Sequence, residues 1–209
     1  MGGIVLAIVV SILPFLYLFT QIQVVGNFTY AFGNIAGFIG ATFLLWEFIL
    51  GIRELAKKIP ATPAHFMKLH IILGVWGMFF VLIHPILEMF SYAEKLTFLF
   101  LPDLSTSMST HITYGRFALL LVLLVWLTST FLRSTISYKK WLNIHYLSYP
   151  MMIFVFIHAL TIGSFLRTFA FIRIYWFMLF GAYLILVVWR MTRVFSKFTQ
   201  SHQNEYKKE

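Results

Sequence analysis

Four histidines stand in two pairs, and each pair lies inside a long apolar stretch. His84 follows His70 by 14 positions, and His158 follows His145 by 13. On an α-helix, which rises about 1.5 Å per residue, each pair would span about 20 Å. Two helices that place these imidazoles opposite one another would create two bis-imidazole sites at two depths. Such sites suit two stacked b-type haems, because imidazole is an axial ligand of haem iron.

The chemistry expected of such sites is electron transfer. A haem iron with imidazole on both axial positions has no open coordination site, which favours outer-sphere electron transfer over direct oxygen binding. The chain has no cysteine, which excludes thiolate ligands, disulfides and covalent c-type haem attachment. The remaining histidines, His65, His111 and His202, lie at segment ends or in polar stretches, and we expect them to be solvated or interfacial.

Membrane-spanning helices are the elements that must position these histidines. Hydrophobic residues make up 60% of the 209 residues and charged residues 11%, and the mean hydropathy is +0.86. A soluble domain has about 25% charged residues, so an ordinary soluble enzyme, a disordered chain and a secreted disulfide scaffold are all excluded. We predict an all-α membrane protein, a six-helix transmembrane bundle. A spanning helix needs about 20 apolar residues, and the six runs are 2–25, 30–52, 64–90, 114–132, 141–162 and 171–195.

The whole chain, 1–209, is expected to be a single transmembrane domain. Outside the spans lie short loops, an outer connection at 91–113 and a polar cytoplasmic tail at 196–209, none of which is long enough for a second domain. The first run resembles a signal peptide in length. Its first three residues carry no basic side chain and no clear cleavage site follows, so we expect a retained helix.

The basic residues predict the orientation of the bundle. Twelve of them would flank one side and four the other. By the positive-inside rule the richer side is cytoplasmic, which places both termini there, with His70 and His145 near the cytoplasmic face. The cytoplasmic set is Arg53, Lys57, Lys58, Lys68, Arg133, Lys139, Lys140, Arg190, Arg193, Lys197, Lys207 and Lys208, and the outer set is Lys95, Arg116, Arg167 and Arg173.

This charge distribution also narrows the partners and the location. A net charge of +9 in short loops beside the spans favours the anionic headgroups of a lipid bilayer, and it disfavours nucleic acid. We expect a multi-pass integral protein of a bacterial or archaeal plasma membrane.

The third predicted span has a stripe of small residues between its histidines. Each residue turns about 100° around a helix, so Gly74 and Gly77 fall close to the line that joins His70 to His84. We expect both glycines to face the haems, because small residues let a flat macrocycle approach the backbone.

The fifth predicted span fits a single face less well. On a straight helix, the step of 13 residues from His145 to His158 would turn the second imidazole away from the first. Pro150 lies between them, and a proline can kink a helix and so reorient a side chain.

A few charged side chains have candidate roles beside the histidines. Haem propionates need cationic partners, which makes Arg116, Arg167 and Arg173 candidates on the outer side. Glu88, four positions after His84, is either a hydrogen-bond acceptor for that imidazole or an interfacial carboxylate. For Glu47 we favour snorkelling or pairing with a nearby base over a role with protons or quinol.

Several of these segments resemble the ferric reductase-like transmembrane domain family. KLHIILG at 68–74, continuing to IHP at 83–85, is similar to the family's third helix, and WLNIHYLSY at 141–149, continuing to IH at 157–158, to its fifth. In that family a tryptophan precedes the first histidine of the fifth helix by four positions, as Trp141 does here. The unequal histidine spacing of the fifth helix also occurs in the family.

The fourth helix of the family is similar to YGR at 114–116 and the apolar run after it, which ends in TS at 128–129. The resemblance therefore covers nearly the whole chain and six helices. The family includes NADPH oxidases, ferric reductases and the MsrQ-like membrane subunit of the bacterial methionine sulfoxide reductase system.

The resemblance implies a dihaem b-type protein that carries electrons across the membrane. His70 and His145 would hold the inner haem, and His84 and His158 the outer one. Electrons would pass from a cytoplasmic flavoprotein or a quinol to an acceptor outside, such as ferric iron, oxygen or a partner reductase.

The electron donor is left open by the sequence. Family oxidases and ferric reductases usually continue into flavin and NAD(P)H domains, but no glycine-rich dinucleotide fingerprint is present among the 209 residues. We therefore expect FAD or FMN only through a partner, a quinol donor, or a longer protein of which this chain is a domain. Such a chain would be an oxidoreductase membrane subunit. The alternative is a non-redox transporter or scaffold protein whose histidines form interhelical hydrogen bonds.

Overall fold

Six helices in the computed structural model are long and apolar enough to cross a membrane. The structure describes residues 2–21, 27–52, 62–92 and 94–206, with side chains as far as 193. These residues contain helices and connections and no strand, which confirms the predicted all-α membrane fold with six spans. The candidate spans are Gly2–Gln21, Phe28–Gly51, Pro63–Ser91, Ser107–Thr130, Tyr138–Ile162 and Ala170–Arg193.

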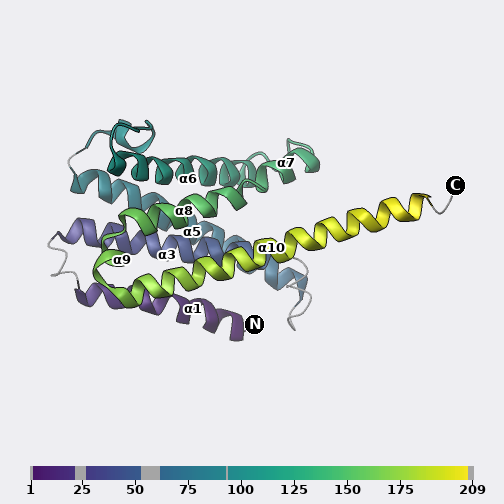
Figure 1. Ribbon diagram of the computed structural model, residues 1–209, viewed down its shortest axis with the longest axis horizontal. Coiled ribbons are helices and arrows are strands. Elements are labelled where there is room, and N and C mark those ends of the chain that lie inside the picture. The colour runs from purple at the N-terminus through teal and green to yellow at the C-terminus, as the bar shows by residue number, and fades with distance from the viewer. Residues whose placement is uncertain (1, 22–26, 53–61, 93, 207–209) are drawn as a thin grey trace.

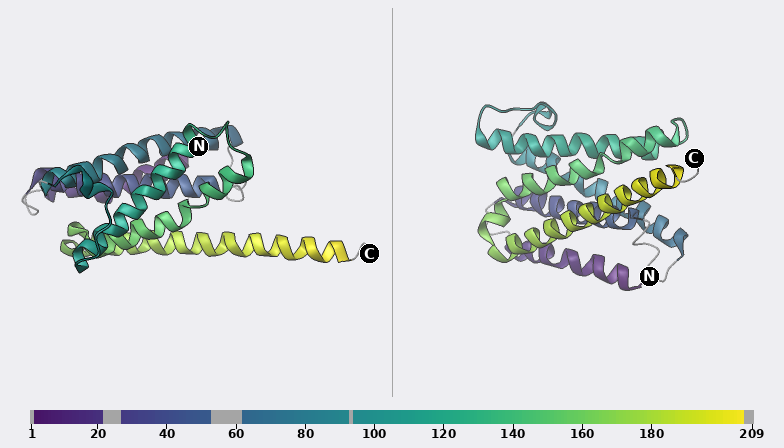
Figure 2. Two further views of the ribbon diagram at one scale, coloured as in Figure 1. Left: turned by 90° about the horizontal axis from the view of Figure 1, so that it is seen from above. Right: turned by 45° about the vertical axis from the view of Figure 1, so that its right-hand side comes forward.

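The helices form an antiparallel bundle in which consecutive spans run in opposite directions (Figure 1). As a result, α1 begins and α10 ends on the same side, and the C-terminal part of α10 projects beyond the bundle (Figure 2). The elements in chain order are α1 Gly2–Leu16, η1 Tyr17–Gln21, α3 Phe28–Gly51, α5 Pro63–Ser91, η2 Leu96–Leu99, α6 Ser107–Thr130, α7 Tyr138–His145, α8 Ser148–Ile162, α9 Ser164–Thr168 and α10 Ala170–Tyr206.

The start of α6 and the end of α10 differ clearly from the boundaries expected of the sequence. α6 begins at Ser107, within the stretch expected to connect two spans, because the hydroxyl of Thr106 accepts the backbone N–H of Ser109 at 3.0 Å and caps the helix. α10 continues to Tyr206, through most of the expected polar tail at 196–209. Of the predicted cytoplasmic basic set, Arg53, Lys57, Lys58, Lys207 and Lys208 lie outside the described residues, as does the side chain of Lys197.

The fifth span is broken into two helices at residues 146–147. The backbone N–H of Leu147 bonds to the carbonyl of Ile144 at 2.9 Å, a tighter turn than that of an α-helix. Pro150 follows in the first turn of α8, where its missing N–H leaves no helical hydrogen bond unmade. The change of direction that the proline suggested therefore lies just before it, between α7 and α8.

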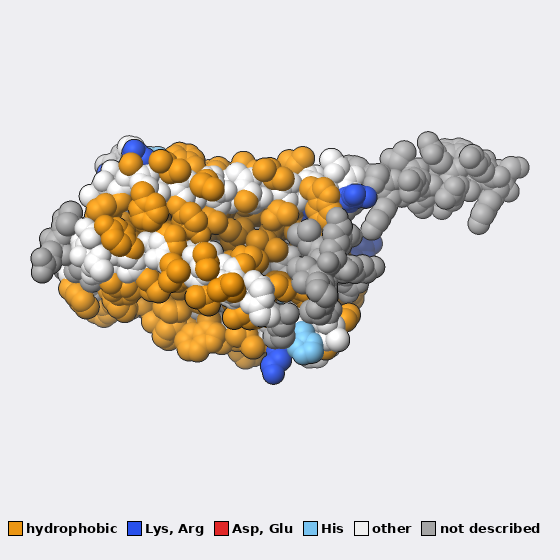
Figure 3. Space-filling model, turned by 90° about the horizontal axis from the view of Figure 1, so that it is seen from below, with side chains coloured by type: hydrophobic (Ala, Val, Ile, Leu, Met, Phe, Trp, Pro, Cys, Tyr) orange, Lys and Arg blue, Asp and Glu red, His pale blue; other side chains and the backbone are white. Residues whose placement is uncertain are grey.

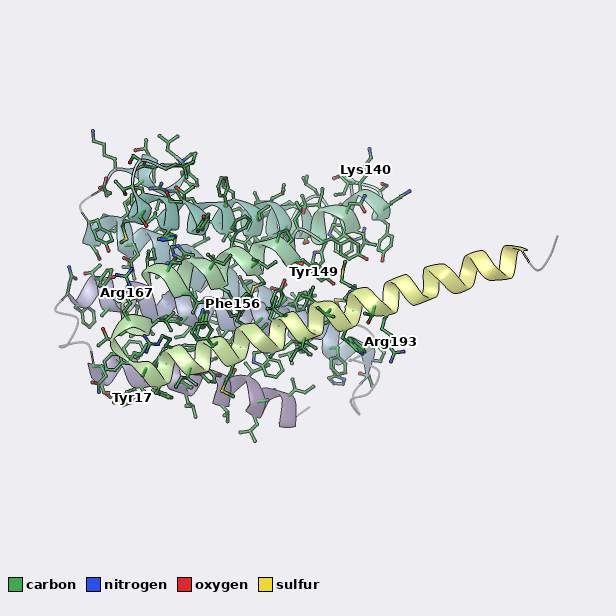
Figure 4. The ribbon with its side chains drawn as sticks, in the orientation of Figure 1. Tyr17, Lys140, Tyr149, Phe156, Arg167 and Arg193 are labelled. Atoms are coloured by element: carbon green, nitrogen blue, oxygen red, sulfur yellow. The ribbon has the colours of Figure 1, made fainter. Side chains whose placement is uncertain are left out.

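The core beside α3 is aromatic. Phe15 of α1 stacks on Phe38 of α3 with ring centres 4.9 Å apart, and Trp176 of α10 packs edge-on against Phe38 at 5.1 Å. Phe156 of α8, labelled in Figure 4, completes this cluster at 4.9 Å from Trp176. Four helices are thereby joined at one depth.

The surface fits a lipid environment. Hydrophobic side chains cover most of the face shown in Figure 3, and the Lys and Arg side chains visible there lie toward its ends. Many large apolar side chains are exposed, among them Ile185 at 70% and Phe90 at 67%. An apolar surface of this extent is typical of helices that face acyl chains.

Candidate functional site: two histidine pairs

The structure brings the four predicted histidines together as two pairs. His70 of α5 and His145, the last residue of α7, have ring centres 6.3 Å apart. His84 of α5 and His158 of α8 have ring centres 6.2 Å apart. Because α7 and α8 are separate helices, both histidines of the fifth span turn toward α5 in spite of their spacing.

Three of the four imidazoles are oriented by backbone carbonyls from another part of the bundle. A carbonyl oxygen only accepts hydrogen bonds, so in each case Nδ1 carries the proton and Nε2 keeps its lone pair. This is the arrangement in which an imidazole binds a metal through Nε2. The three bonds run from His70 to the carbonyl of Glu47 (3.0 Å), from His84 to that of Gly33 (2.9 Å) and from His158 to that of His111 (2.9 Å).

These acceptors could not be found from residue types, because any residue has a carbonyl. His111 is an example: its side chain was expected to be solvated or interfacial, and its backbone carbonyl accepts Nδ1–H of His158, in the pair predicted to be the outer one. Its position three residues before the predicted fourth span gave no signal of this role.

His145 has a different environment. Its Nδ1 lies 3.4 Å from the hydroxyl of Ser129, and its ring stacks on Trp141 with centres 4.8 Å apart and planes 26° from parallel. The indole of Trp141 donates its N–H to the same hydroxyl at 3.3 Å. Two side chains thus contact this imidazole where the other three are held by the backbone.

The donor set fits an axially ligated macrocycle better than a bare metal ion. Among the described residues, no group of three or more His, Cys, Asp or Glu side chains is placed to hold a metal ion. A haem needs only two axial ligands from the protein. If each nitrogen lies about 2 Å from the metal, two imidazoles on opposite sides of one metal have ring centres about 6 Å apart. Both observed pairs have this separation.

Glycines stand where a side chain would displace the outer pair. A Cβ on Gly115 of α6 would lie 2.6 Å from Cε1 of His158, and a Cβ on Gly37 of α3 would lie 3.0 Å from Nδ1 of His84. Neither position can take a larger residue without movement of the imidazole.

The glycines predicted to face the haems lie against α3. A Cβ on Gly74 would lie 2.8 Å from Oε1 of Glu47, and a Cβ on Gly77 would lie 3.3 Å from Cβ of Phe43. Both therefore serve the close packing of α3 on α5, the role that small residues commonly have between membrane helices.

A mainly apolar cavity adjoins the outer pair. It is enclosed by α3, α5, α6, α8 and α10 and is lined in part by Gly37, His84, Gly115, Arg116, His158 and Trp176. Its apolar walls would exclude water from a bound group, and the imidazoles of His84 and His158 are the ring nitrogens among its lining residues that could bind a metal.

One of the three outer arginines lies at this cavity. Arg116 is 9% exposed, donates its Nε–H to the carbonyl of Phe98 at 2.6 Å and lies over the Phe98 ring. Arg167 donates instead to the carbonyl of Thr161 and is exposed at the end of the bundle (Figure 4). Arg173 is also exposed, and neither of these two lines the cavity.

The charge of Arg116 also affects the pKa of Asp103, in the connection at 91–113. Hydrogen bonds from Ser105 and Ser109, together with this guanidinium, hold the pKa of Asp103 below its ordinary value. The hydroxyl of Thr113 ties the same connection to α6, since it donates to the carbonyl of Asp103 at 2.8 Å.

Both glutamates of the spans approach a paired histidine. Oε1 of Glu88 accepts the Asn34 amide at 2.9 Å and lies 3.9 Å from Nδ1 of His84. Oε1 of Glu47 lies 3.6 Å from Nε2 of His70. Both carboxylates thus lie between α3 and α5. Arg53, the base suggested as a partner for Glu47, lies outside the described residues.

Comparison with protein families adds to this geometry. A family model described as the ferric reductase like transmembrane component matches residues 36–157, more than half of the chain. The chain belongs to this ferric reductase-like family. The matched range includes His70, His84 and His145 and ends one residue before His158. No curated protein and no solved structure matches the chain.

Membership of the ferric reductase-like family confirms the resemblance seen in the sequence. It indicates transmembrane electron transfer as the general role. The matched residues run from α3 through most of α8 and include three of the four paired histidines.

Proposed function

We propose that this protein is a dihaem b-type membrane protein that moves electrons from a cytoplasmic flavoprotein or a quinol to an acceptor at the outer face. The observation that carries the proposal is the geometry of the two histidine pairs, with ring centres 6.3 and 6.2 Å apart. The carbonyl bonds that leave Nε2 of three imidazoles unprotonated support it further.

The ligands follow from the pairing. His70 and His145 would hold an inner b-type haem, and His84 and His158 an outer one. When bound, these groups supply one-electron carriers at two depths of the membrane. The chain fixes their separation, because His70 and His84 lie on one continuous helix and differ by about 20 Å in height.

Other residues of the outer site also suit a haem, which is planar and carries charged propionates. Gly37 and Gly115 keep the space beside the imidazoles clear. Arg116 would pair with a propionate, a role supported by its bond to the carbonyl of Phe98 and its place among the residues that line the cavity. Arg167 and Arg173 are less suited to this role, because both are exposed and lie off the cavity.

The orientation in the proposal follows from charge. Lys140 and Arg193 lie at one end of the bundle and Arg167 at the other (Figure 4). In the span assignment made from the sequence, this end receives twelve of the sixteen lysine and arginine residues, so we assign it to the cytoplasm. The pair of His70 and His145 then faces the donor, and the pair of His84 and His158 faces the acceptor.

Electron passage across a sealed membrane tests the function. The purified protein, with its cofactors, is reconstituted into vesicles that contain trapped ferricyanide, and reduced flavin mononucleotide is supplied outside. We expect the trapped oxidant to be bleached with this protein and not with His84→Ala. A His65→Ala variant, which alters an exposed histidine, should behave like the parent. Equal bleaching by the parent and His84→Ala, or none by the parent, would contradict the function.

A further inference from the structure

Within the part of the chain that the structure describes, one of the four paired imidazoles has a side chain rather than a backbone carbonyl as its hydrogen-bond partner. His70, His84 and His158 each bond to a carbonyl at 2.9 to 3.0 Å, whereas the described partner of His145 Nδ1 is the Ser129 hydroxyl at 3.4 Å. His145 is also the last residue of the eight-residue helix α7, directly before the break at 146–147. A ligand at such a place needs other groups to fix its ring.

Ser129 is placed to accept the Nδ1 proton of His145, as a backbone carbonyl does for each of the other three imidazoles. An indole N–H only donates, so the bond from Trp141 at 3.3 Å makes the Ser129 oxygen an acceptor. Its second lone pair can accept Nδ1–H of His145, which leaves Nε2 unprotonated as in the other three imidazoles. Ser129 lies near the C-terminal end of α6, against which α7 packs.

Trp141 makes a second contact with the His145 ring, in addition to the long hydrogen bond to Ser129. Its ring covers one face of the His145 imidazole, with centres 4.8 Å apart. The guanidinium of Arg133 covers the indole in turn, 4.6 Å from its centre, an arrangement that stabilises the indole in place. Because Trp141 and His145 are four residues apart on one helix, the stack forms on a single face.

We propose that Ser129 and Trp141 position His145 as the inner haem ligand, a role that rests on the proposed function. Neither residue touches the iron. Both act through the imidazole: Ser129 accepts the Nδ1 proton in the tautomer that binds iron through Nε2, and Trp141 limits rotation of the ring. Groups that orient a ligating histidine typically contribute about 10- to 100-fold to metal affinity.

The test measures the inner haem alone, in a His84→Ala chain that keeps the ligands of the inner site and lacks one ligand of the outer site. The haem affinity of the stripped protein and the low-spin EPR signal, which depends on the angle between the two imidazole planes, are both measured. Ser129→Ala and Trp141→Leu should weaken haem binding by about tenfold or more and shift the EPR signal. Ser129→Thr, which keeps the hydroxyl, should match the parent, and Trp141→Phe, which keeps only the stack, should fall between.

Controls separate positioning from folding. Trp76→Leu alters a tryptophan that is 52% exposed on α5 and should leave the inner signal unchanged. In the chain with His84 intact, Trp141→Leu should keep the outer haem, and loss of both haems would contradict a local role. Unchanged affinity and EPR signal in Ser129→Ala and Trp141→Leu, with loss of the signal in His145→Ala, would overturn this inference and leave the proposed function standing. A parent chain that binds no haem would overturn both.

Discussion

His84 and His158 face each other with ring centres 6.2 Å apart, almost the separation of 6.3 Å between His70 and His145. The two ring separations are nearly equal, although the histidines of the third span are 14 residues apart and those of the fifth span are 13 residues apart. The break at 146–147 accounts for this, because it lets α7 and α8 present their histidines independently. Two equivalent ligand pairs at two depths are thus compatible with unequal spacing in the sequence.

Removal of one ligand should empty one site and spare the other. His84→Ala deletes half of the outer pair, while His70 lies about 20 Å away along α5 and keeps its bond to the carbonyl of Glu47. We expect the purified variant to contain half the haem of the parent, measured as pyridine haemochrome per mole of protein. Full haem content in His84→Ala, or complete loss, would contradict independent sites.

A methyl group at position 115 should disturb the outer site selectively. The new Cβ of Gly115→Ala would lie 2.6 Å from Cε1 of His158, a distance that forces the imidazole or α6 to move. We expect loss of most of the outer haem with the inner haem retained. The matched control is Gly181→Ala on α10, where no atom lies within 4 Å of the added group, and its haem content should equal that of the parent.

Substitutions of Arg116 and Arg173 should differ in their effect on outer-haem affinity. Arg116→Gln removes the cation that lines the outer cavity and donates to Phe98, so we expect outer-haem affinity to fall by about tenfold. Arg173→Gln, which changes an exposed residue off the cavity, should leave affinity unchanged. Haem titration of the stripped proteins compares them, and equal curves for all three chains would exclude Arg116 as a propionate partner.

The absence of cysteine makes the orientation directly measurable. Single cysteines at Lys140 and Arg167 would lie at opposite ends of the bundle (Figure 4), on a background with no other thiol. In intact cells, a membrane-impermeant maleimide should label Arg167→Cys and spare Lys140→Cys until the membrane is opened. The reverse pattern would place the basic end outside and invert the proposed direction of electron flow.

Much of the fold was predictable from apolar runs and much of the site from four histidines. The six spans follow from length and hydropathy, because lipid demands both. The pairing of His70 with His145 followed from their similar depth in parallel helices. The hydrogen-bond partners of the imidazoles could not be predicted, because they are backbone groups. The carbonyls of Gly33, Glu47 and His111 orient three imidazoles, and every residue type has a carbonyl.

The glycines show the same limit. Helical periodicity placed Gly74 and Gly77 on the stripe of the histidines, but it could not tell that α3 packs against both positions. Gly37 and Gly115 lie against the outer pair instead. They belong to α3 and α6, and only the packing of four helices brings them there.

The cofactor content of the purified protein tests the central claim most directly. A pyridine haemochrome assay on the folded chain from haem-replete cells should give about two b-type haems per polypeptide, with a Soret band and a reduced α-band, because each histidine pair provides two axial ligands. A correctly folded preparation that is colourless, or that binds a single haem, would contradict the account.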